Sequence, residues 1–321
     1  MAIVAGIDEA GLGPVVGPLV ISASVFRVAD ADVDGCLWRR LAGAVTRRAF
    51  RKSSALPIAD SKTMHVRSDG VLHLERGVLG VLTGSGPPPA TLREFLRRHS
   101  PATPAEMEGY PWYAGADLPL PRQADATDVR LRANAFGEAM ARAGVAFQGL
   151  RVEPVLEGSF NRLIHATRNK SVALMGVVGR LVAWVFHTHS DGSPMRLVVD
   201  RLGGRVRYLQ PLMRMFPEAA VKIVEETPQR SAYLVRQDDR SMSIAFQVDA
   251  DADDLPTALA SMASKYAREL FMELLNAWWM ARIAGLKPTA GYHPDGVRFL
   301  KDIDSYVSAR GIDKSLLVRC R

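Results

Sequence analysis

Two adjacent carboxylates near the start of the chain are the first residues that suggest chemistry. Asp8 and Glu9 follow the apolar run at residues 2–7 and precede Gly11 and Gly13 in the stretch GIDEAGLGPVVGPLV. Successive side chains of a strand point to opposite faces, so both acids serve one site only if the backbone bends here. The pair on its own leaves two interpretations open: an ordinary strand end before a turn, or part of a metal or acid–base site.

Two further acids lie in elements that the sequence predicts elsewhere. Asp200 ends the short apolar run 196–200 (RLVVD), a predicted buried strand, at the carboxyl edge where open α/β sheets bind ligands. Glu269 lies in a long helix predicted over 257–282, whose start is marked by the acids DADADD at 249–254. A solvated strand end for Asp200 and a solvated charged stripe for Glu269 are the simpler alternatives.

A divalent metal would bring these separated acids together. Mg²⁺ and Mn²⁺ prefer carboxylate oxygens and water, and a two-metal site holds its ions ~3.5–4 Å apart between acids from separate elements. The candidate catalytic and metal-binding residues are therefore Asp8, Glu9, Asp200 and Glu269. The chain has 41 Lys and Arg against 34 Asp and Glu, a net charge of +7, which favours a polyanionic partner such as nucleic acid. Acids gathered on a basic protein favour a phosphodiester substrate over a glycoside.

The remaining sequence predicts an α/β protein with one excursion from its core. A strand is predicted over 146–155, and helices are predicted over 128–143 and 169–187. Residues 219–248 contain β-rich runs that indicate a hairpin or meander. Residues 85–130 are rich in Pro and Gly with little periodicity, so we interpret them as a partly irregular insertion. A solvated insertion is favoured there over a substrate clamp or a partner site.

The composition disfavours several other classes of protein. Cys36 and Cys320 lie far apart and form no Cys/His cluster, so neither a structural zinc site nor a disulfide framework is expected. The N-terminus lacks the basic and then apolar order of a signal peptide, and no run approaches the ~20 apolar residues of a membrane span. We therefore expect a cytoplasmic protein without a membrane partner, and the sequence leaves the oligomeric state open.

Five short motifs follow one another along the chain in an order that is hard to obtain by chance. They are GIDEAGLGPVVGPLV at 6–20, DSK at 60–62, VVD at 198–200, ASMASKYARE at 260–269 and AGY at 290–292. Together they resemble the motifs of type 2 ribonuclease H, the family of ribonucleases HII and HIII. The resemblance implies the ribonuclease H-like α/β fold, with a mixed five-stranded sheet flanked by helices and a helical C-terminal part.

The resemblance also implies a domain organisation and an activity. The catalytic core would comprise residues 1–84 and 131–284, with 85–130 as the insertion and 285–321 as the C-terminal helical segment. The activity would be cleavage of the RNA strand of RNA/DNA hybrids, or of a ribonucleotide embedded in duplex DNA. Such cleavage leaves 5′-phosphate and 3′-hydroxyl ends and uses Mg²⁺ or Mn²⁺ in a two-metal site.

The family's functional residues transfer to this chain position by position. The four acids Asp8, Glu9, Asp200 and Glu269 fall on the family's metal-binding acids. The positions implied to bind substrate are the loop that reads the 2′-hydroxyl with its backbone, the lysine of the DSK motif and the tyrosine beside the junction sugar. These are Gly11, Leu12, Gly13, Lys62 and Tyr292.

Three departures from the family pattern concern the same residues. Leu12 stands where the family usually has Arg, which removes a cation beside the substrate. Glu269 stands where Asp is common, and its extra methylene shifts the carboxylate by about 1 Å. Arg201 stands where Gly is frequent, and Arg201, Arg205 and Arg207 either replace lost phosphate contacts or are surface arginines. Two alternatives therefore stay open: a hybrid-binding protein of the same fold with little or no catalysis, and another nuclease of the ribonuclease H-like superfamily.

Overall fold

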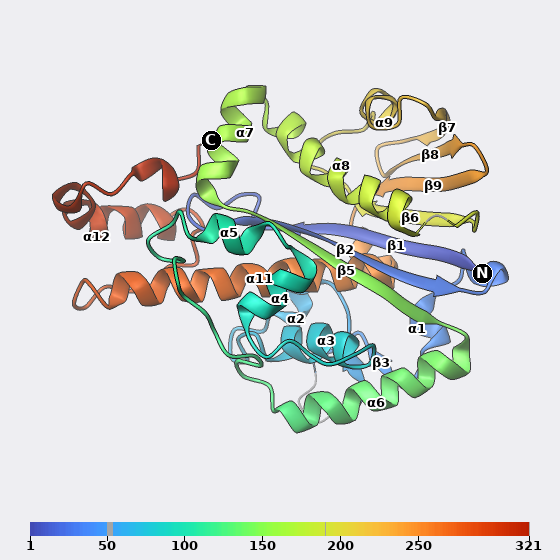
Figure 1. Cartoon of the computed structure of the whole chain (residues 1–321), viewed down its shortest axis with the longest axis horizontal. Coiled ribbons are helices and arrows are strands. Elements are labelled where there is room, and N and C mark those ends of the chain that lie inside the picture. The colour runs from blue at the N-terminus through green and yellow to red at the C-terminus, as the bar shows by residue number, and fades with distance from the viewer. Residues whose placement is uncertain (50–53, 190, 321) are drawn as a thin grey trace.

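A mixed β-sheet forms the centre of the protein (Figure 1). The computed structural model describes residues 1–49, 54–189 and 191–320, and within these ranges seven strands join in the order β5-β2-β1-β6-β9-β8-β7. The strands are β1 Ala2–Ala10, β2 Leu19–Val28, β5 Ala146–Val155, β6 Met195–Asp200, β7 Ala220–Glu226, β8 Arg230–Gln237 and β9 Arg240–Gln247. β1, β6 and β9 run parallel at the centre, and antiparallel partners extend the sheet on both sides.

The sheet is larger than the resemblance implied, although the mixed sheet flanked by helices is confirmed. In the described part of the chain it has seven strands instead of five. The β-rich stretch 219–248 explains the difference, because it forms the predicted meander as β7, β8 and β9. β9 pairs with β6 in parallel. A two-residue turn joins β8 to β9, so β8 pairs antiparallel with the other edge of β9 and its backbone hydrogen-bonds there. A separate pair of short strands, β3 (Val45–Thr46) and β4 (Leu56–Pro57), lies outside this sheet.

Helices cover both faces of the sheet. In the view of Figure 1, α7 and α8 lie on one side, and α3, α6 and α11 lie on the other. The helices are α1 Leu37–Arg40, α2 Ser61–Met64, α3 Leu72–Thr83, α4 Leu92–His99, α5 Thr103–Met107, α6 Ala126–Ala143, α7 Glu157–Thr167, α8 Lys170–His189, α9 Leu209–Met215, α10 Ala250–Asp253, α11 Leu255–Met280 and α12 Asp295–Arg310. Short 3₁₀ turns occur at Asp30–Asp32 and Lys314–Leu316.

The long helix α11 lies directly against the central strands. Asp254 caps its start by accepting a hydrogen bond from the backbone N–H of Thr257 at 3.1 Å, and Pro256 occupies the first turn, where no N–H is needed. Small side chains then let the helix approach the sheet closely. A Cβ placed on Gly6 of β1 would lie only 2.1 Å from the backbone N of Thr257. The hydroxyl of Ser264 donates to the backbone carbonyl of Asp8 at 3.0 Å, which ties the helix to the end of β1.

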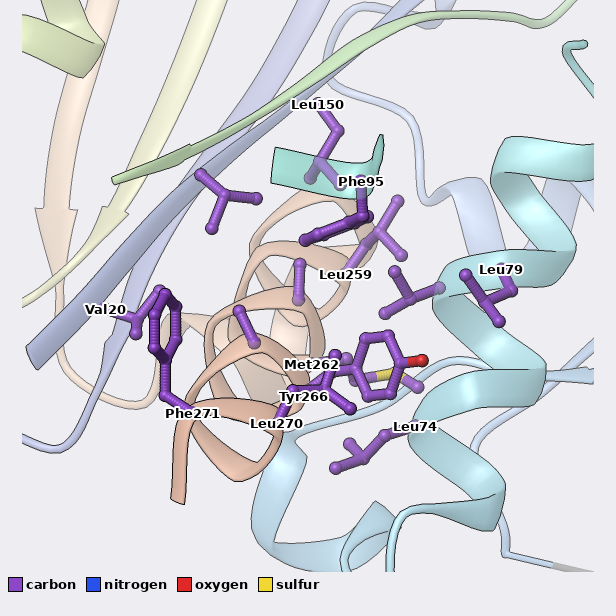
Figure 2. Close-up of a cluster of buried hydrophobic side chains, with 14 of the residues drawn as sticks. Val20, Leu74, Leu79, Phe95, Leu150, Leu259, Met262, Tyr266, Leu270 and Phe271 are labelled. Atoms are coloured by element: carbon purple, nitrogen blue, oxygen red, sulfur yellow. The ribbon is translucent and has the colours of Figure 1, made fainter. Parts of the chain in front are cut away.

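The opposite side of α11 carries most of the apolar core on this face. Figure 2 shows its side chains packed among residues of α3, α4 and the strands. The buried cluster includes Val20, Leu74, Leu79, Phe95, Leu150, Leu259, Met262, Tyr266, Leu270 and Phe271. Burial of side chains of this size contributes about 1.5–3 kcal/mol each, so this helix is a principal source of stability for the strands β1 and β2 that it covers.

The other face of the sheet is covered by α8. Its buried side chains, among them Leu174, Val178, Leu181 and Val185, belong to a second apolar cluster with alternate residues of β1, such as Ile3 and Ile7. By length and composition α8 would be able to cross a membrane, which differs from the expectation that no segment approaches that length. In this structure its apolar side instead covers the sheet.

The segment 85–130 contains α4, α5 and the first residues of α6. Between α5 and α6 it buries three aromatic side chains, Tyr110, Trp112 and Tyr113. The ring of Tyr113 lies 5.1 Å from that of Phe271, and the ring of Trp112 lies 6.2 Å from that of Trp279, both on α11. These aromatic contacts attach the segment to the core despite its Pro- and Gly-rich sequence.

We expect Gly6→Ala to destabilise the protein by about 3 kcal/mol, because the added methyl group would overlap the backbone of α11. Gly176→Ala in α8 is the matched control, since a Cβ there meets no heavy atom within 4 Å. The control substitution should be neutral or stabilise by up to about 1 kcal/mol. Urea unfolding of both variants measures the difference, and equal stabilities would show that α11 does not contact β1 this closely.

Candidate active site

The parallel strands bring three acids together at one edge of the sheet. Ile7 of β1 pairs with Val199 of β6, so the next residues, Asp8 and Asp200, lie side by side where the parallel ladder of β1 and β6 ends. One carboxylate oxygen from each of Asp8, Glu9 and Asp200 lies within 4.8 Å of the others. The β1–β2 ladder continues through the last residue of β1, so Asp8 and Glu9 meet without the backbone bend that the sequence suggested.

A further acid reaches the same place from α10. Gln247, the last residue of β9, pairs with Asp200, and the chain continues from there into the short helix that carries Asp251. Asp251 lines the same cavity as the three acids, and its Oδ2 accepts a hydrogen bond from Ser261 at 3.2 Å. The sequence pattern did not identify Asp251, because acids such as those at 249–254 are also typical of a helix start. Their place directly after a strand parallel to β6 is the signal that could have identified it.

Glu269 does not join the acid cluster. Its Oε1 accepts a hydrogen bond from Lys265 Nζ at 2.6 Å, and it also lies 3.6 Å from Arg268 and 4.0 Å from His65. Burial opposes ionisation of Glu269, but the charge and hydrogen bond of Lys265 outweigh it, so its pKa lies below the ordinary value. Among the described residues, Asp251 is therefore better placed to be a further metal ligand than Glu269. Glu269 lies two helical turns beyond Ser261, whereas Asp251 lies at the cavity.

The clustered acids carry negative charge that their surroundings do not compensate. Burial, followed by the charges of Glu9 and Asp200, raises the pKa of Asp8 well above its ordinary value. Burial and the charge of Asp200 raise the pKa of Glu9 to about 7. Burial raises the pKa of Asp200 to about 6. The hydrogen bond from the backbone N–H of Ala250 lowers this pKa, and the charge of Asp251 raises it.

One oxygen of the cluster also lacks a partner. Glu9 Oε2 is buried and has no hydrogen bond within the described residues. A hard divalent cation supplies both the positive charge and the missing interaction, and it prefers carboxylate oxygens. The donor set therefore fits Mg²⁺ or Mn²⁺.

The acids open into a cavity of about 450 Å³. The residues predicted to bind substrate line the same cavity: Gly11, Leu12, Gly13, Lys62 and Tyr292. Gly11 has φ +87°, and a Cβ there would lie 2.5 Å from Arg268 Nε, so this position requires glycine. A Cβ on Gly13 would meet nothing within 4 Å, which leaves its backbone accessible to a ligand.

A buried network holds the glycine loop, residues 11–17, from beneath. Arg319, near the end of the chain, donates hydrogen bonds to the carbonyl oxygens of Gly11 and, at 3.0 Å, Leu12. Glu157 accepts a hydrogen bond from the backbone N–H of Gly17 at 3.1 Å. Burial raises the pKa of Glu157 to about 7 and lowers that of Arg319 to about 10. No sequence motif marked these residues, since Arg319 and Gly11 are 308 positions apart.

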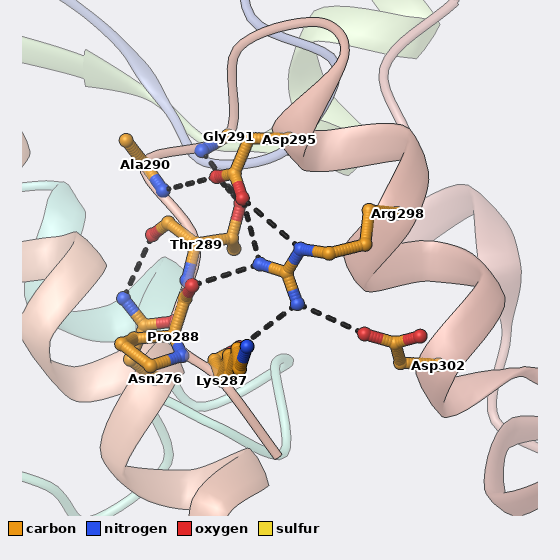
Figure 3. Close-up of polar contacts among 9 residues, drawn as sticks. All are labelled: Asn276, Lys287, Pro288, Thr289, Ala290, Gly291, Asp295, Arg298 and Asp302. Carbon is orange, nitrogen blue, oxygen red and sulfur yellow. Dashed lines mark hydrogen bonds and ion pairs between the residues drawn. The ribbon is translucent and has the colours of Figure 1, made fainter.

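Polar contacts also fix the loop that carries Tyr292 (Figure 3). The carboxylate of Asp295 accepts hydrogen bonds from the hydroxyl of Thr289 at 2.6 Å and from the next backbone N–H at 2.9 Å. The carbonyl of Gly291 accepts a hydrogen bond from the backbone N–H of Val15 at 2.9 Å. This hydrogen bond joins the Tyr292 loop to the glycine loop, and both loops line the cavity.

The arginines that follow Asp200 contact other parts of the molecule. Arg201 donates to the carbonyl of Pro228, and Arg205 Nε donates to the hydroxyl of Ser171 at 3.1 Å. Neither these two nor the exposed Arg207 is among the described residues that line the acidic cavity. The structure thus favours the surface interpretation of these arginines over the replacement of phosphate contacts in this cavity.

Comparisons with known proteins give distant structural likenesses. No family model and no curated protein matches the chain. The RNase HII of Archaeoglobus fulgidus, from a complex with PCNA, is similar with a TM-score of 0.44 at 15% identity, covering 99% of this chain and 92% of that one. The ribonuclease H2 of Pyrococcus horikoshii OT3 has a TM-score of 0.41 at 15% identity, covering 98% and 92%. Bst-RNase HIII in complex with Mn²⁺ has a TM-score of 0.44 at 12% identity, covering 99% and 66%.

All three of these structures are type 2 ribonucleases H.

We expect Mg²⁺ or Mn²⁺ to raise the melting temperature of the protein, because a ligand that binds only the folded state stabilises it. Asp8→Asn should raise the melting temperature without metal, since it removes charge repulsion, and should reduce the shift that metal produces.

Asp251→Asn should weaken metal binding by about tenfold or more, whereas Glu269→Gln should leave it nearly unchanged. Thermal melting over a metal titration measures all three variants, and the reverse order for Asp251 and Glu269 would contradict the assignment.

We also expect Glu157→Gln to change how stability depends on pH. Glutamine keeps an acceptor for the N–H of Gly17 and removes the buried charge. The pKa of Glu157 is raised from 4.5 to about 7 on folding, so the wild type loses stability as the pH rises through this interval. The variant should therefore gain stability relative to the wild type between pH 5 and pH 8, by at most about 3 kcal/mol. Denaturant unfolding at both pH values tests this, and a pH-independent difference would contradict it.

Proposed function

We propose that this chain is a divalent-metal-dependent endonuclease that cleaves at ribonucleotides, either in the RNA strand of an RNA/DNA hybrid or embedded in duplex DNA. Cleavage would leave 5′-phosphate and 3′-hydroxyl ends. One observation carries the proposal: a buried carboxylate cluster that fits divalent cations shares a cavity with an open glycine loop and an exposed tyrosine. The net charge of +7 supports a polyanionic substrate.

The acids at the strand ends would hold the metal. Asp8, Glu9 and Asp200 would provide carboxylate ligands, and Asp251 would act from α10 in the place first predicted for Glu269. A bound pair of Mg²⁺ or Mn²⁺ ions supplies an activated water and neutralises the charge on the leaving 3′-oxygen. The contribution of the protein is to keep these carboxylates fixed in position, with Asp200 oriented by the backbone N–H of Ala250 at 2.9 Å.

Glu269 has a different role in this proposal. Its ion pair with Lys265 directs an ammonium group that lines the cavity, where a substrate phosphate would lie. Glu269 is then a positioning residue. The presence of Glu at this position, where Asp is more common, therefore leaves the metal ligands undisturbed.

The neighbouring loops would recognise the ribose and the backbone. The accessible main chain of Gly13, beside the buried Gly11, suits a hydrogen bond to a 2′-hydroxyl, which is the group that distinguishes RNA from DNA at one position. Tyr292, with 42% of its surface exposed, offers a flat surface for the sugar beside it. Lys62 and Lys265 would contact phosphates, which position a nucleic acid without reading its sequence.

A cleavage assay tests the proposal. The wild-type protein with Mg²⁺ or Mn²⁺ should cut a DNA duplex that contains one ribonucleotide, or an RNA/DNA hybrid, and Asp8→Asn should slow this by about a thousandfold or more. Asp239→Asn in the exposed turn between β8 and β9 is the matched control and should cut at the wild-type rate. Replacing every ribose by deoxyribose should abolish cleavage, because no 2′-hydroxyl is left for the glycine loop.

Two outcomes would overturn the proposal in favour of the alternatives left open by the sequence. If the wild type and Asp8→Asn gave equal amounts of product, the result would support the alternative of a hybrid-binding protein with little or no catalysis. Equal cleavage of the all-deoxyribose duplex would instead identify another nuclease of the ribonuclease H-like superfamily.

A further inference from the structure

A second cavity, of about 440 Å³, adjoins the glycine loop that also borders the acidic cavity. Gly13 lines both cavities, and His293, which lines the second, directly follows Tyr292, which lines the first. A strand laid across the loop from the acidic cavity would therefore reach this second cavity. Its remaining polar side chains include Lys170, at the start of α8, and Arg319.

The charges in this second cavity are of one sign. Lys170 and Arg319 contribute two cations, and no Asp or Glu is among the described residues that line it. Lys170 is exposed and has no ion pair in the described part of the chain. Burial, then the charge of Arg319, lowers the pKa of Lys170, so the two cations repel one another. Glu157, the carboxylate that acts on Arg319 from below, is engaged with the N–H of Gly17.

Arg319 is a rigid component of this cavity. Its guanidinium lies 4.0 Å from the centre of the Phe160 ring, and its terminal nitrogens donate to the carbonyls of Gly11 and Leu12. The ammonium of Lys170 lies 5.9 Å from the same ring. The amide groups at the start of α8 do not form this site, because the side chain of Asn169 already caps two of them. The positive charge of the site therefore comes from the side chains of Lys170 and Arg319, which both lie over the ring of Phe160.

The glycine loop itself brings no cation to a substrate. Its side chains are all uncharged, and Leu12 packs against the apolar cluster between the sheet and α8. A nucleic-acid strand that crosses the loop would meet Lys62 and Lys265 in the acidic cavity and Lys170 and Arg319 in the second cavity, whereas Arg268 is buried beside Gly11. Phosphates gain affinity from such fixed cations through hydrogen bonds and the release of counterions.

We infer that this second cavity, built by Lys170, Arg319 and His293 beside Gly13, is a binding site for a backbone phosphate of the nucleic-acid strand that occupies the acidic cavity. The inference rests on the proposed function and names a contact of the same substrate away from the bond that is cut. His293 adds an imidazole that is able to donate a hydrogen bond.

Binding measurements with an exposed lysine test this inference. Lys170→Gln should weaken binding of a fluorescent RNA/DNA hybrid in Ca²⁺ by about three- to tenfold and lower the slope of log K against log salt by about 0.7–0.9. Lys222→Gln, the same change on the exposed edge strand β7, is the control and should alter neither value. Both variants should melt at the wild-type temperature, because neither lysine forms an ion pair in the described part of the chain.

A neutral methylphosphonate placed at one linkage after another then locates the contact. The wild type should lose affinity about three- to tenfold at one linkage outside the scissile phosphate, and Lys170→Gln should show no further loss there. Equal losses in the wild type and the variant at every linkage would overturn the site, as would a Lys170→Gln variant that binds like Lys222→Gln.

These outcomes are separable from those of the proposed function. A wild type that cuts ribonucleotide substrates, with Lys170→Gln indistinguishable from its control, overturns the phosphate site alone. A wild type that shows the Lys170-dependent methylphosphonate effect and yet cuts none of these substrates supports the phosphate site and overturns the proposed nuclease.

Discussion

Mutual repulsion between carboxylates at the ends of parallel strands is the constraint on which the arrangement of this protein depends. Asp8 and Asp200 are neighbours because β1 and β6 pair in parallel register. Glu9 follows Asp8 in the chain, so its carboxylate stays near the other two. Burial removes the water that would otherwise screen these charges, so the free protein holds them at a cost in stability. Such a site persists only where the surrounding fold determines the position of each group independently.

The surrounding fold does so through contacts between distant parts of the chain. Ser264 of α11 holds the backbone at Asp8, and the N–H of Ala250 holds the carboxylate of Asp200. The glycine loop is attached both to the segment near Gly291 and to Arg319. Residues 1–20 and 290–320 therefore form one structure around the cavity, and the sheet supplies the rigid base that loops of this length lack.

The electrostatic pattern around the glycine loop follows from the same architecture. Negative charge gathers where parallel strands end, and positive charge gathers beyond the loop at Lys170 and Arg319. A phosphodiester backbone needs cations along its length, whereas the bond to be cut needs carboxylates that hold metal. The acidic cavity holds the carboxylates together with Lys62 and Lys265, and the second cavity adds Lys170 and Arg319, so one strand path would meet both kinds of group.

Local patterns in the sequence were sufficient to predict the elements that carry the site. Apolar runs bounded by glycine or acids became β1 and β6, and the continuous apolar character of 196–200 indicated a buried parallel strand. The spacing of the β-rich stretch 219–248 predicted the meander, but the number of strands in the sheet depended on where β9 found its partner. Pairing of strands far apart in sequence is not encoded in the pattern of any one of them.

The sequence by itself determined that Asp8 and Glu9 lie near a strand end before a glycine loop and that Asp200 ends another strand, because strand periodicity and chain punctuation are local properties. Only the tertiary structure decided between Glu269 and Asp251. Helical spacing shows which residues share a face, but which turn of α11 reaches the cavity depends on how closely the helix packs on Gly6. The roles of Arg319 and Glu157 likewise come from folding alone, since burial beneath the loop, and not residue type, gives them their partners.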